Sequence, residues 1–385
     1  MYGDMGVFPA TQQLPGPALN NIGNLIDDVA AGRIDWIVHS GDHAYEFEEY
    51  LTSADAKADR AAGDRGDGYM DSYQPLLAHA PWAPGFGNHE YLRGDKANRL
   101  LNITAGLISE LGRSAGPLGM TAQWYSVNVG LLHLVHLDFS PYFCNFTGCC
   151  GHKGNCGFTE RWSCDFAGYR AAILAWTSQD LRAVNRAATP FVVVSTHFPL
   201  YDTYNDSLAD PADPAIPGRH DPSSADWKPT GRGGLGPAGG PAVATKAQAL
   251  LDLEPLLLKY AVDVYFAGHN HNYETTWPVA RNRTVQKSYV DPRAPVHVTS
   301  GAGGPRGLEG NFGPAQDWSR GPRLCNASYS RVEITADGRR MRWEQVANAD
   351  GRILDNFTIV RTSDRGPESG ALSTGSGKDS TPRAL

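Results

Sequence analysis

Two histidines one residue apart follow an apolar segment in the C-terminal half of the chain. The segment Ala261–Ala267 is rich in Val, Tyr and Phe, which predicts a buried strand, and Gly268 allows the backbone to turn sharply after it. His269 and His271 follow this turn. Two imidazoles at this spacing can bind one metal ion or two adjacent ions. Taken alone, the stretch is equally compatible with a pair of surface histidines in a loop.

The same arrangement, an apolar segment followed by a metal-binding side chain, recurs elsewhere in the chain. Asp4, Asp42, Asn88 and His197 each lie at or just after the end of a predicted strand. The carboxyl ends of strands in an open α/β sheet border one crevice, so these side chains can converge with the two histidines. Carboxylates, an amide and imidazoles are ligands for Fe, Zn and Mn. A bridging Asp would give a two-metal centre, which is chemistry suited to cleaving phosphate esters.

Five ordered sequence blocks resemble those of the purple acid phosphatases, within the calcineurin-like metallophosphoesterases. The blocks are Gly3-Asp-Met-Gly6, Gly41-Asp-His-Ala-Tyr45, Gly87-Asn-His-Glu90, Val194-Ser-Thr-His197 and Gly268-His-Asn-His271. The resemblance implies an α/β (α+β) fold, a four-layer αββα sandwich of two mixed sheets flanked by helices. The first strand is expected to be truncated here, because only Met1 and Tyr2 precede the first block.

The resemblance also implies a ligand set for two metal ions. The implied ligands are Asp4, Tyr45 and His271 for Fe(III), Asp42 as the bridge, and Asn88, His197 and His269 for a second ion, which would be Zn, Fe or Mn. A phenolate on Fe(III) would give a charge-transfer colour. Tyr45 separates this family from the protein Ser/Thr phosphatases, which otherwise share the motif pattern.

The implied reaction is attack of a metal-bound hydroxide on a phosphate monoester, and no Ser or Cys nucleophile is required. Asn88 and His89 are expected to contact the substrate, and His89 would protonate the leaving group; its alternative role is to orient Asp42. His220 is a weaker catalytic candidate. Tyr201 could reach the substrate, although packing at a strand edge is the alternative. Competing functions are a phosphodiesterase or nucleotide pyrophosphatase on the same site, or a truncated, non-catalytic metal-binding glycoprotein.

Length and composition fit one large catalytic domain. The chain has 385 residues, 41% hydrophobic and 19% charged. We predict a domain over residues 1–361 that includes C-terminal strands over 295–361, and a disordered tail over 362–385. A net charge of −7 argues against a nucleic-acid partner, and the lack of a long apolar run predicts no membrane span. Small phosphate esters are the expected partners, and the family resemblance implies a homodimer as one assembly.

Cysteines and glycosylation sequons favour a secretory route. Disulfide candidates are Cys144, Cys149, Cys150, Cys156, Cys164 and Cys325, with a structural zinc site as the alternative. Glycosylation candidates are Asn102, Asn145, Asn205, Asn282, Asn326 and Asn356. These features predict a secreted protein or one of the secretory or vacuolar lumen. No signal peptide precedes them, so we expect an N-terminal piece to be missing.

Overall fold

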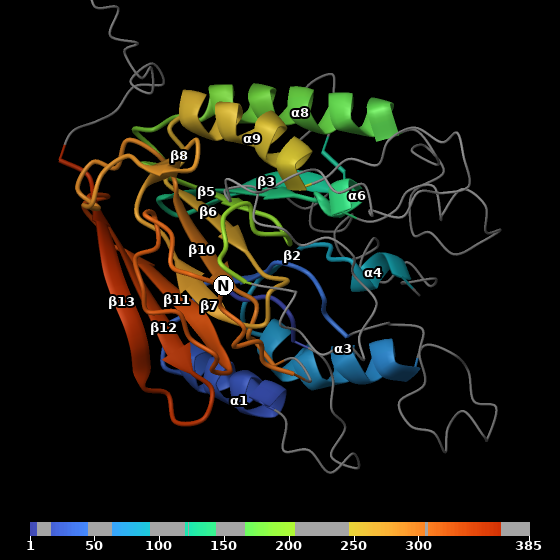
Figure 1. Ribbon diagram of the computed structural model, residues 1–385. Coiled ribbons are helices and arrows are strands. Elements are labelled where there is room, and N and C mark those ends of the chain that lie inside the picture. The colour runs from blue at the N-terminus through green and yellow to red at the C-terminus, as the bar shows by residue number, and fades with distance from the viewer. Residues whose placement is uncertain are drawn as a thin grey trace, which may run out of the picture.

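The computed structural model describes residues 1–5, 17–44, 64–92, 120–121, 123–143, 166–204, 246–304 and 307–362, and every structural statement below concerns these residues. A six-stranded mixed sheet lies at the centre of the molecule (Figure 1), with the strand order β3-β4-β5-β6-β10-β7. Its strands are β3 (Trp124–Val129), β4 (Leu132–Leu137), β5 (Phe191–Ser195), β6 (Val264–Ala267), β10 (Val296–Ser300) and β7 (Tyr273–Thr275).

The parallel direction of the strands places His197 and His269 at the same end of the sheet, beyond the carboxyl ends of two neighbouring strands. β4, β5, β6 and β10 are parallel, and β3 and β7 run antiparallel to their neighbours. β5 and β6 pair in register, with Ser195 opposite Phe266. Both strands therefore end at the same level, and the residues after them, His197 and His269, lie side by side.

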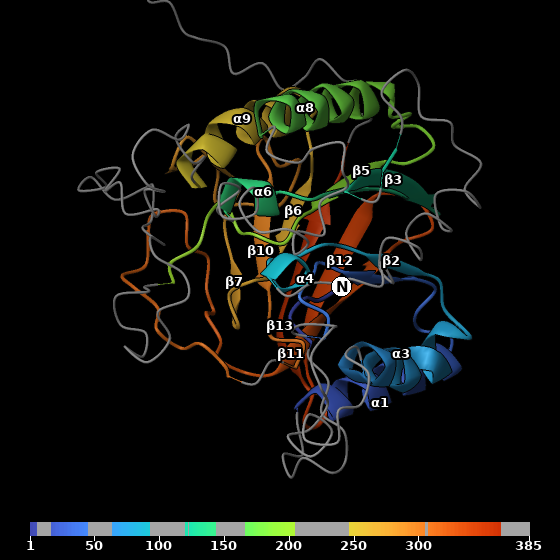
Figure 2. The same cartoon turned by 90° about the vertical axis from the view of Figure 1, so that its right-hand side faces the viewer.

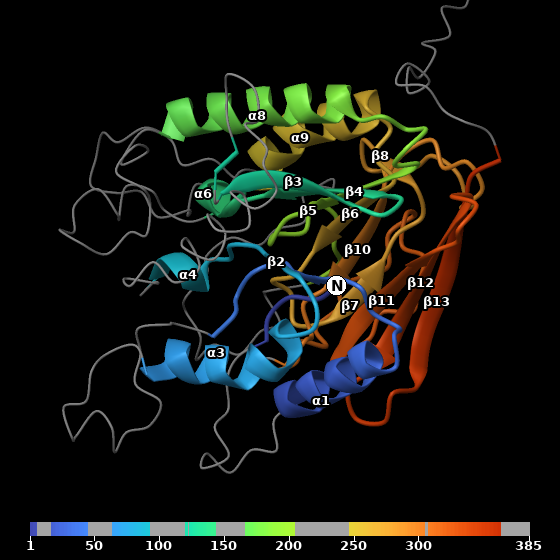
Figure 3. The ribbon, with the colours of Figure 1, turned by 180° about the vertical axis from the view of Figure 1, so that it is seen from behind.

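Two helices cover one face of the six-stranded sheet, α8 (Phe166–Ala183) and α9 (Lys246–Lys259), as Figures 1 and 3 show from opposite sides. On α8 the buried positions include Tyr169, Ile173 and Trp176, which recur every three or four residues and so share one helical face. They join an apolar cluster with Leu253 and Leu257 of α9. Burial of this cluster fixes the two helices against the sheet.

A second β layer packs on the other face of the sheet. It contains the parallel pair β1 (Ile37–His39) and β2 (Trp82–Pro84), and the antiparallel sheet of β11 (Ser328–Ile334), β12 (Arg340–Ala347) and β13 (Ile353–Val360). Phe266 and Val298 share an apolar cluster with Trp343 and Phe357 of this layer. Helices α1 (Pro17–Ala30) and α3 (Asp64–Leu77) cover its outer side (Figure 2). Three apolar clusters thus separate four layers.

The prediction of two mixed sheets is correct for only one of them. In the described part of the chain, the second layer consists of the β1–β2 pair and a separate antiparallel sheet. The residues before Asp4 link these two parts, because Tyr2 forms a parallel bridge with His39 and the Met1 carbonyl accepts a 2.9 Å hydrogen bond from the Ser330 amide. These contacts of Met1 and Tyr2 connect the two parts without forming one continuous ladder.

Short elements complete the described structure. They are α4 (His89–Leu92), α6 (Ser140–Phe143), β8 (Val279–Ala280) and β9 (Arg283–Thr284), of which β8 and β9 form a two-stranded hairpin. None of the described helices has the length and apolarity required to cross a membrane.

Candidate metal centre

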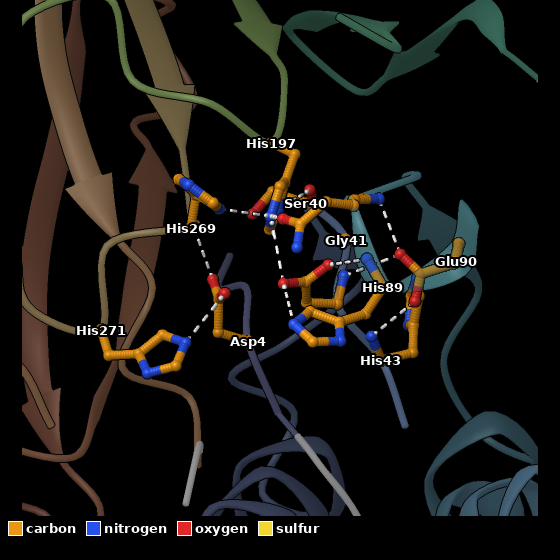
Figure 4. A network of polar contacts seen from close by, with 12 residues as sticks. Asp4, Ser40, Gly41, His43, His89, Glu90, His197, His269 and His271 are labelled. Atoms are coloured by element: carbon orange, nitrogen blue, oxygen red, sulfur yellow. Dashed lines mark hydrogen bonds and ion pairs between the residues drawn. The ribbon is translucent and has the colours of Figure 1, made fainter. Parts of the chain in front are cut away.

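Six of the predicted metal ligands lie together at the ends of strands from both β layers, and Figure 4 labels four of them, Asp4, His197, His269 and His271. The six are Asp4, Asp42, Asn88, His197, His269 and His271, and all are buried except His271, whose side chain is 20% exposed. Asp42 and Asn88 follow β1 and β2, whereas His197 and His269 follow β5 and β6. Tyr45 and His220 lie outside the described residues. The centre therefore forms where the two layers meet.

His197 lies at the middle of a group of polar side-chain atoms from three other residues. Its Nε2 is 3.1 Å from Asn88 Oδ1, 3.2 Å from Asp42 Oδ2 and 3.1 Å from His269 Nδ1. Its Nδ1 lies 3.1 Å from the Ser40 carbonyl oxygen, which can only accept, so Nδ1 carries a proton. In the neutral ring, Nε2 then presents a lone pair to an amide oxygen, a carboxylate oxygen and another imidazole.

A metal cation can bind the His197 Nε2 lone pair and the side-chain atoms around it at the same time. Nε2 carries at most one hydrogen, so a proton there can bond to only one of its three neighbours. One ligand atom each from Asp42, His197 and His269 lies within 4.8 Å of the others. Imidazole nitrogens and carboxylate oxygens are ligands of Zn, Fe and Mn. The geometry and the donor types both fit a metal ion.

Asp4 and His271 form the neighbouring half of the cluster. Asp4 Oδ2 accepts a 2.7 Å hydrogen bond from the His269 amide, and Asp4 Oδ1 lies 3.5 Å from His271 Nε2. His271 Nδ1 lies 2.7 Å from the Gly307 carbonyl oxygen, so Nδ1 is the protonated nitrogen. Hydrogen bonds of this kind orient metal-binding histidines and fix their tautomer. The His271 imidazole is thus also held with its Nε2 toward a carboxylate, that of Asp4.

Three of these ligands have a strained backbone. Asp4, Asp42 and His269 have φ angles of 59°, 56° and 68°, in the left-handed region that costs free energy for residues with a side chain. Two glycines leave room for the carboxylates: a Cβ on Gly87 would lie 2.2 Å from Asp42 Oδ1, and one on Gly268 would lie 2.5 Å from Asp4 Oδ2. The fold maintains a strained, close-packed geometry here, as is common at functional sites.

Charge coupling within the cluster shifts the pKa of its members. Burial would raise the pKa of Asp42, but the positive charges of His197 and His89 hold that pKa well below its usual range. Burial opposes the charged form of His197, yet the carboxylates of Asp42 and Asp4 raise the pKa of this imidazole to about 9. Burial raises the pKa of Asp4. Without a metal, His197 supplies the positive charge that the two carboxylates require.

His89 borders the cluster at the start of α4. Its backbone amide donates a 3.0 Å hydrogen bond to Asp42 Oδ1, and its Nε2 lies 3.9 Å from Asp42 Oδ2. The side chain is 25% exposed, so it faces both the carboxylate and solvent. This position is compatible with either predicted role, contact with a substrate or orientation of Asp42.

Tyr201 is placed within the core. The side chain is buried, and its hydroxyl donates a 2.6 Å hydrogen bond to Glu254 Oε1 of α9 and accepts one of 3.0 Å from the Asn282 amide. The ring packs against Trp318. These contacts support the packing alternative rather than the predicted contact with substrate.

The cysteine and sequon predictions fall largely outside the described residues. The candidates that lie outside the described residues are Cys144, Cys149, Cys150, Cys156, Cys164, Asn102, Asn145 and Asn205. Cys325 is exposed and forms no disulfide with a described residue. Asn326 and Asn356 are exposed, whereas Asn282 is partly buried and its Oδ1 accepts a 2.7 Å hydrogen bond from Trp318 Nε1. The two exposed sequons are accessible to modification.

Two carboxylates that support the ligands had no role assigned from the sequence. Glu90 closes the Gly-Asn-His-Glu block and accepts hydrogen bonds from three backbone amides, those of Asp42, His43 and Gly87. Glu309 accepts a 2.9 Å hydrogen bond from the His271 amide. The position of Glu90 inside a motif was a usable signal, but Glu309 is distant from every block and carried none.

Family comparison agrees with the fold and the donor set. Residues 2–273 match the model of the calcineurin-like phosphoesterases, and residues 294–356 match that of the iron/zinc purple acid phosphatase-like protein C-terminal region. The chain therefore belongs to the calcineurin-like phosphoesterases. Within that class it is a purple acid phosphatase-like member, because its C-terminal segment matches as well.

Similar proteins carry phosphatase names at low identity. Acid phosphatase type 7 of Danio rerio is 26% identical over 90% of this chain and 66% of its own length, and the human protein of that name is 27% identical over 87% and 63%. Purple acid phosphatase 21 of Arabidopsis thaliana is 25% identical over 86% and 62%. The chain thus spans about two-thirds of the length of these relatives. A relative in the same plant, 23% identical, is named probable inactive purple acid phosphatase 9.

Solved structures show the same fold at greater distance. A purple acid phosphatase from yellow lupin seeds superposes with a TM-score of 0.57 at 20% identity, covering 94% of this chain and 53% of that one. GAP50, the anchor in the inner membrane complex of Plasmodium, superposes with a TM-score of 0.56 at 13% identity, covering 94% and 88%. One fold can serve different functions, so the ligand cluster is a better indication of function than the fold.

Proposed function

We propose that this chain is an acid phosphatase that hydrolyses phosphate monoesters at a centre of two metal ions. The observation that carries the proposal is the convergence of an amide oxygen, a carboxylate oxygen and an imidazole nitrogen within 3.2 Å of His197 Nε2. The family membership and the names of the relatives support the same reaction class.

The described residues divide into two groups of ligands under this proposal. Asn88, His197 and His269 would hold one ion, and Asp4, His271 and Tyr45 would hold the other. Asp42 would be shared by both. Metal ions held there would supply Lewis acidity toward phosphate oxygens and lower the pKa of a bound water. Fe(III) with Zn, Fe or Mn suits this donor set.

Hydrogen bonds in the protein prepare the ligands for this task. The Ser40 and Gly307 carbonyls keep the Nδ1 protons on His197 and His271, so that both rings offer Nε2 as a lone pair. His89 lies within reach of the bridging Asp42 and is partly open to solvent. It would hold the proton that the leaving alkoxide receives, which is a general-acid role.

Rates on a monoester and on a diester test the substrate class. We expect the metal-loaded chain to hydrolyse p-nitrophenyl phosphate faster than bis(p-nitrophenyl) phosphate. A faster rate on the diester would favour the phosphodiesterase alternative. Absence of both activities in the metal-loaded protein would favour a non-catalytic metal-binding protein.

A visible absorption spectrum tests the Fe(III) assignment separately. A tyrosinate bound to Fe(III) should give a broad visible band in the mildly oxidised protein, and Tyr45→Phe should remove it. A band that survives the substitution would exclude Tyr45 as the iron ligand.

A secretory location is also part of the proposal, supported by the exposure of the sequon residues Asn326 and Asn356. Expression of the chain behind a signal peptide in a eukaryotic secretory host should give a glycosidase-sensitive mass at one or both sites. Unmodified protein from that host would contradict this part.

A further inference from the structure

We infer that Glu90 is a positioning residue that ties together the two loops carrying Asp42 and Asn88, an inference that rests on the proposed metal centre. Its side chain is buried, and both carboxylate oxygens accept backbone hydrogen bonds. Oε2 accepts from the Asp42 amide at 2.9 Å and from the Gly87 amide at 2.6 Å, and Oε1 accepts from the His43 amide at 2.9 Å. The three donors belong to the loops that follow β1 and β2.

The contact begins where the pairing of β1 and β2 ends. The parallel register runs from Ile37 opposite Trp82 to His39 opposite Pro84, and the Gly85 amide adds one further bond to the His39 carbonyl. Beyond that point the two segments leave the strand direction and form the loops that carry Asp42 and Asn88. After the ladder stops, Glu90 connects the two loops through three backbone amides. The His89 amide bond to Asp42 Oδ1 and the 2.8 Å contact between His43 Nε2 and the Gly85 carbonyl oxygen join the same loops.

The Asp42 backbone needs such support because its φ of 56° is unfavourable for a residue with a side chain. Glu90 fixes the amide of Asp42 and that of the next residue, His43. It also fixes Gly87, directly before Asn88. This carboxylate thus contacts the backbone on both sides of the gap between Asp42 and Asn88, and helps to set their spacing.

Only a carboxylate matches this set of partners. An ionised Glu is an acceptor at both oxygens, and all three neighbouring groups are donors. In Glu90→Gln, the NH₂ group would face either the His43 amide or the pair from Asp42 and Gly87, leaving one or two buried N–H groups without an acceptor. Since both oxygens are engaged by backbone, Glu90 acts through the ligands rather than on substrate.

Zinc affinity of the metal-free full chain tests this inference, with Glu274→Gln as the matched control. Glu274 is equally buried, at 2% exposure, and likewise accepts from a backbone amide and a hydroxyl, both of Thr203, but its bonds lie outside the Asp42 and Asn88 loops. We expect Glu90→Gln to weaken Zn²⁺ binding by about 10–100-fold, the usual effect of losing a group that orients metal ligands. Glu274→Gln should retain the wild-type affinity.

Excess zinc provides a second readout. If Glu90 positions ligands, hydrolysis of p-nitrophenyl phosphate by Glu90→Gln should recover at least in part as Zn²⁺ is raised. Equal losses of affinity in both variants would mean a general effect of removing a buried carboxylate, and would overturn the inference. An unchanged affinity in Glu90→Gln would overturn it too, whereas a wild-type chain that binds no metal would contradict the proposed function itself.

Amide hydrogen exchange in the metal-free wild type tests the contact even if Glu90→Gln does not fold. The amides of Asp42, His43 and Gly87 should exchange slowly before any metal is added, because Glu90 already holds them. Fast exchange that becomes slow only with Zn²⁺ would show that the metal orders these loops, and would overturn the inference.

Discussion

At the scale of single residues, the protonation of His197 couples the centre to pH. In the metal-free protein, Asp42 and Asp4 raise the pKa of His197 to about 9 from an ordinary 6.5. This raised value stabilises the folded metal-free chain fully below pH 6.5, and the contribution is lost as the pH rises through 9. A metal ion at Nε2 must displace that proton, so metal affinity should rise with pH up to about 9.

Proton release on metal binding checks this coupling. Zinc added to the metal-free chain at pH 7 in weak buffer should release protons, and His197→Gln should release fewer and bind zinc more weakly. His79→Gln, at an exposed position, is the control. Binding in the wild type without proton release would contradict the placement of His197 in the centre.

Substitution of His89 should affect the rate and not the metal content, because His89 is not among the proposed ligands. His89→Gln should lower kcat for p-nitrophenyl phosphate by about 10²–10⁴-fold, the usual contribution of a general acid. Metal content should stay at the wild-type level. If metal is lost together with activity, the role of the His89 side chain is to orient Asp42, whose Oδ2 lies 3.9 Å from His89 Nε2.

At the scale of elements, glycines beside the ligands decide whether the strand ends can approach one another. A Cβ on Gly87 would lie 2.2 Å from Asp42 Oδ1 and 2.7 Å from the Asp42 amide nitrogen. Gly87→Ala should therefore displace one of the two loops and weaken metal binding. Gly23→Ala on α1 meets no atom within 4 Å and should stabilise the chain by about 0.5–1 kcal/mol. Thermal unfolding and zinc titration of both variants measure this contrast, and unchanged binding in Gly87→Ala would contradict it.

Much of the fold at this scale followed from local patterns. The apolar segments before His197 and His269 predicted β5 and β6. The division of the second layer into two parts could not be foreseen, because it depends on how Tyr2 and Met1 bridge β1 and β11. Pairing of this kind depends on contacts between segments more than 300 residues apart in sequence, as from Met1 to Ser330.

The site was predictable where ligand-type residues stand at strand ends inside motifs. The cluster of Asp42, His197 and His269 arises in this way. Tyr201 was harder to place, because a Tyr after a strand can face either a crevice or a helix, and only the position of Glu254 on α9 shows which. Glu309 supports His271 from a loop without regular structure, where no periodic pattern marks a position.

At the scale of the whole molecule, a buried ion cluster joins the layers at the end of the sheet remote from the metal centre. Asp263, just before β6, accepts hydrogen bonds from Arg186 Nη1 at 2.8 Å and from Arg361, which follows β13. Arg186 follows α8, so one carboxylate connects a helix, the mixed sheet and the antiparallel sheet.

Removal of that charge should destabilise the entire fold. Asp263→Asn leaves two largely buried guanidinium groups without their carboxylate, which costs about 3–5 kcal/mol. Chemical denaturation measures the loss, with Asp350→Asn in the exposed pair with Arg352 as the control that should change little. A small effect at Asp263 would mean that water or other groups replace the carboxylate.

The most direct test of the central claim is the metal dependence of phosphomonoester hydrolysis. The chain is stripped with a chelator, then titrated with Fe and Zn while bound metal and the rate on p-nitrophenyl phosphate are measured together. We expect no activity without metal, recovery that follows the binding of two ions per chain, and loss of both activity and two-ion binding in His197→Gln. Hydrolysis that persists in the stripped protein, or two ions bound with undiminished affinity by His197→Gln, would contradict it.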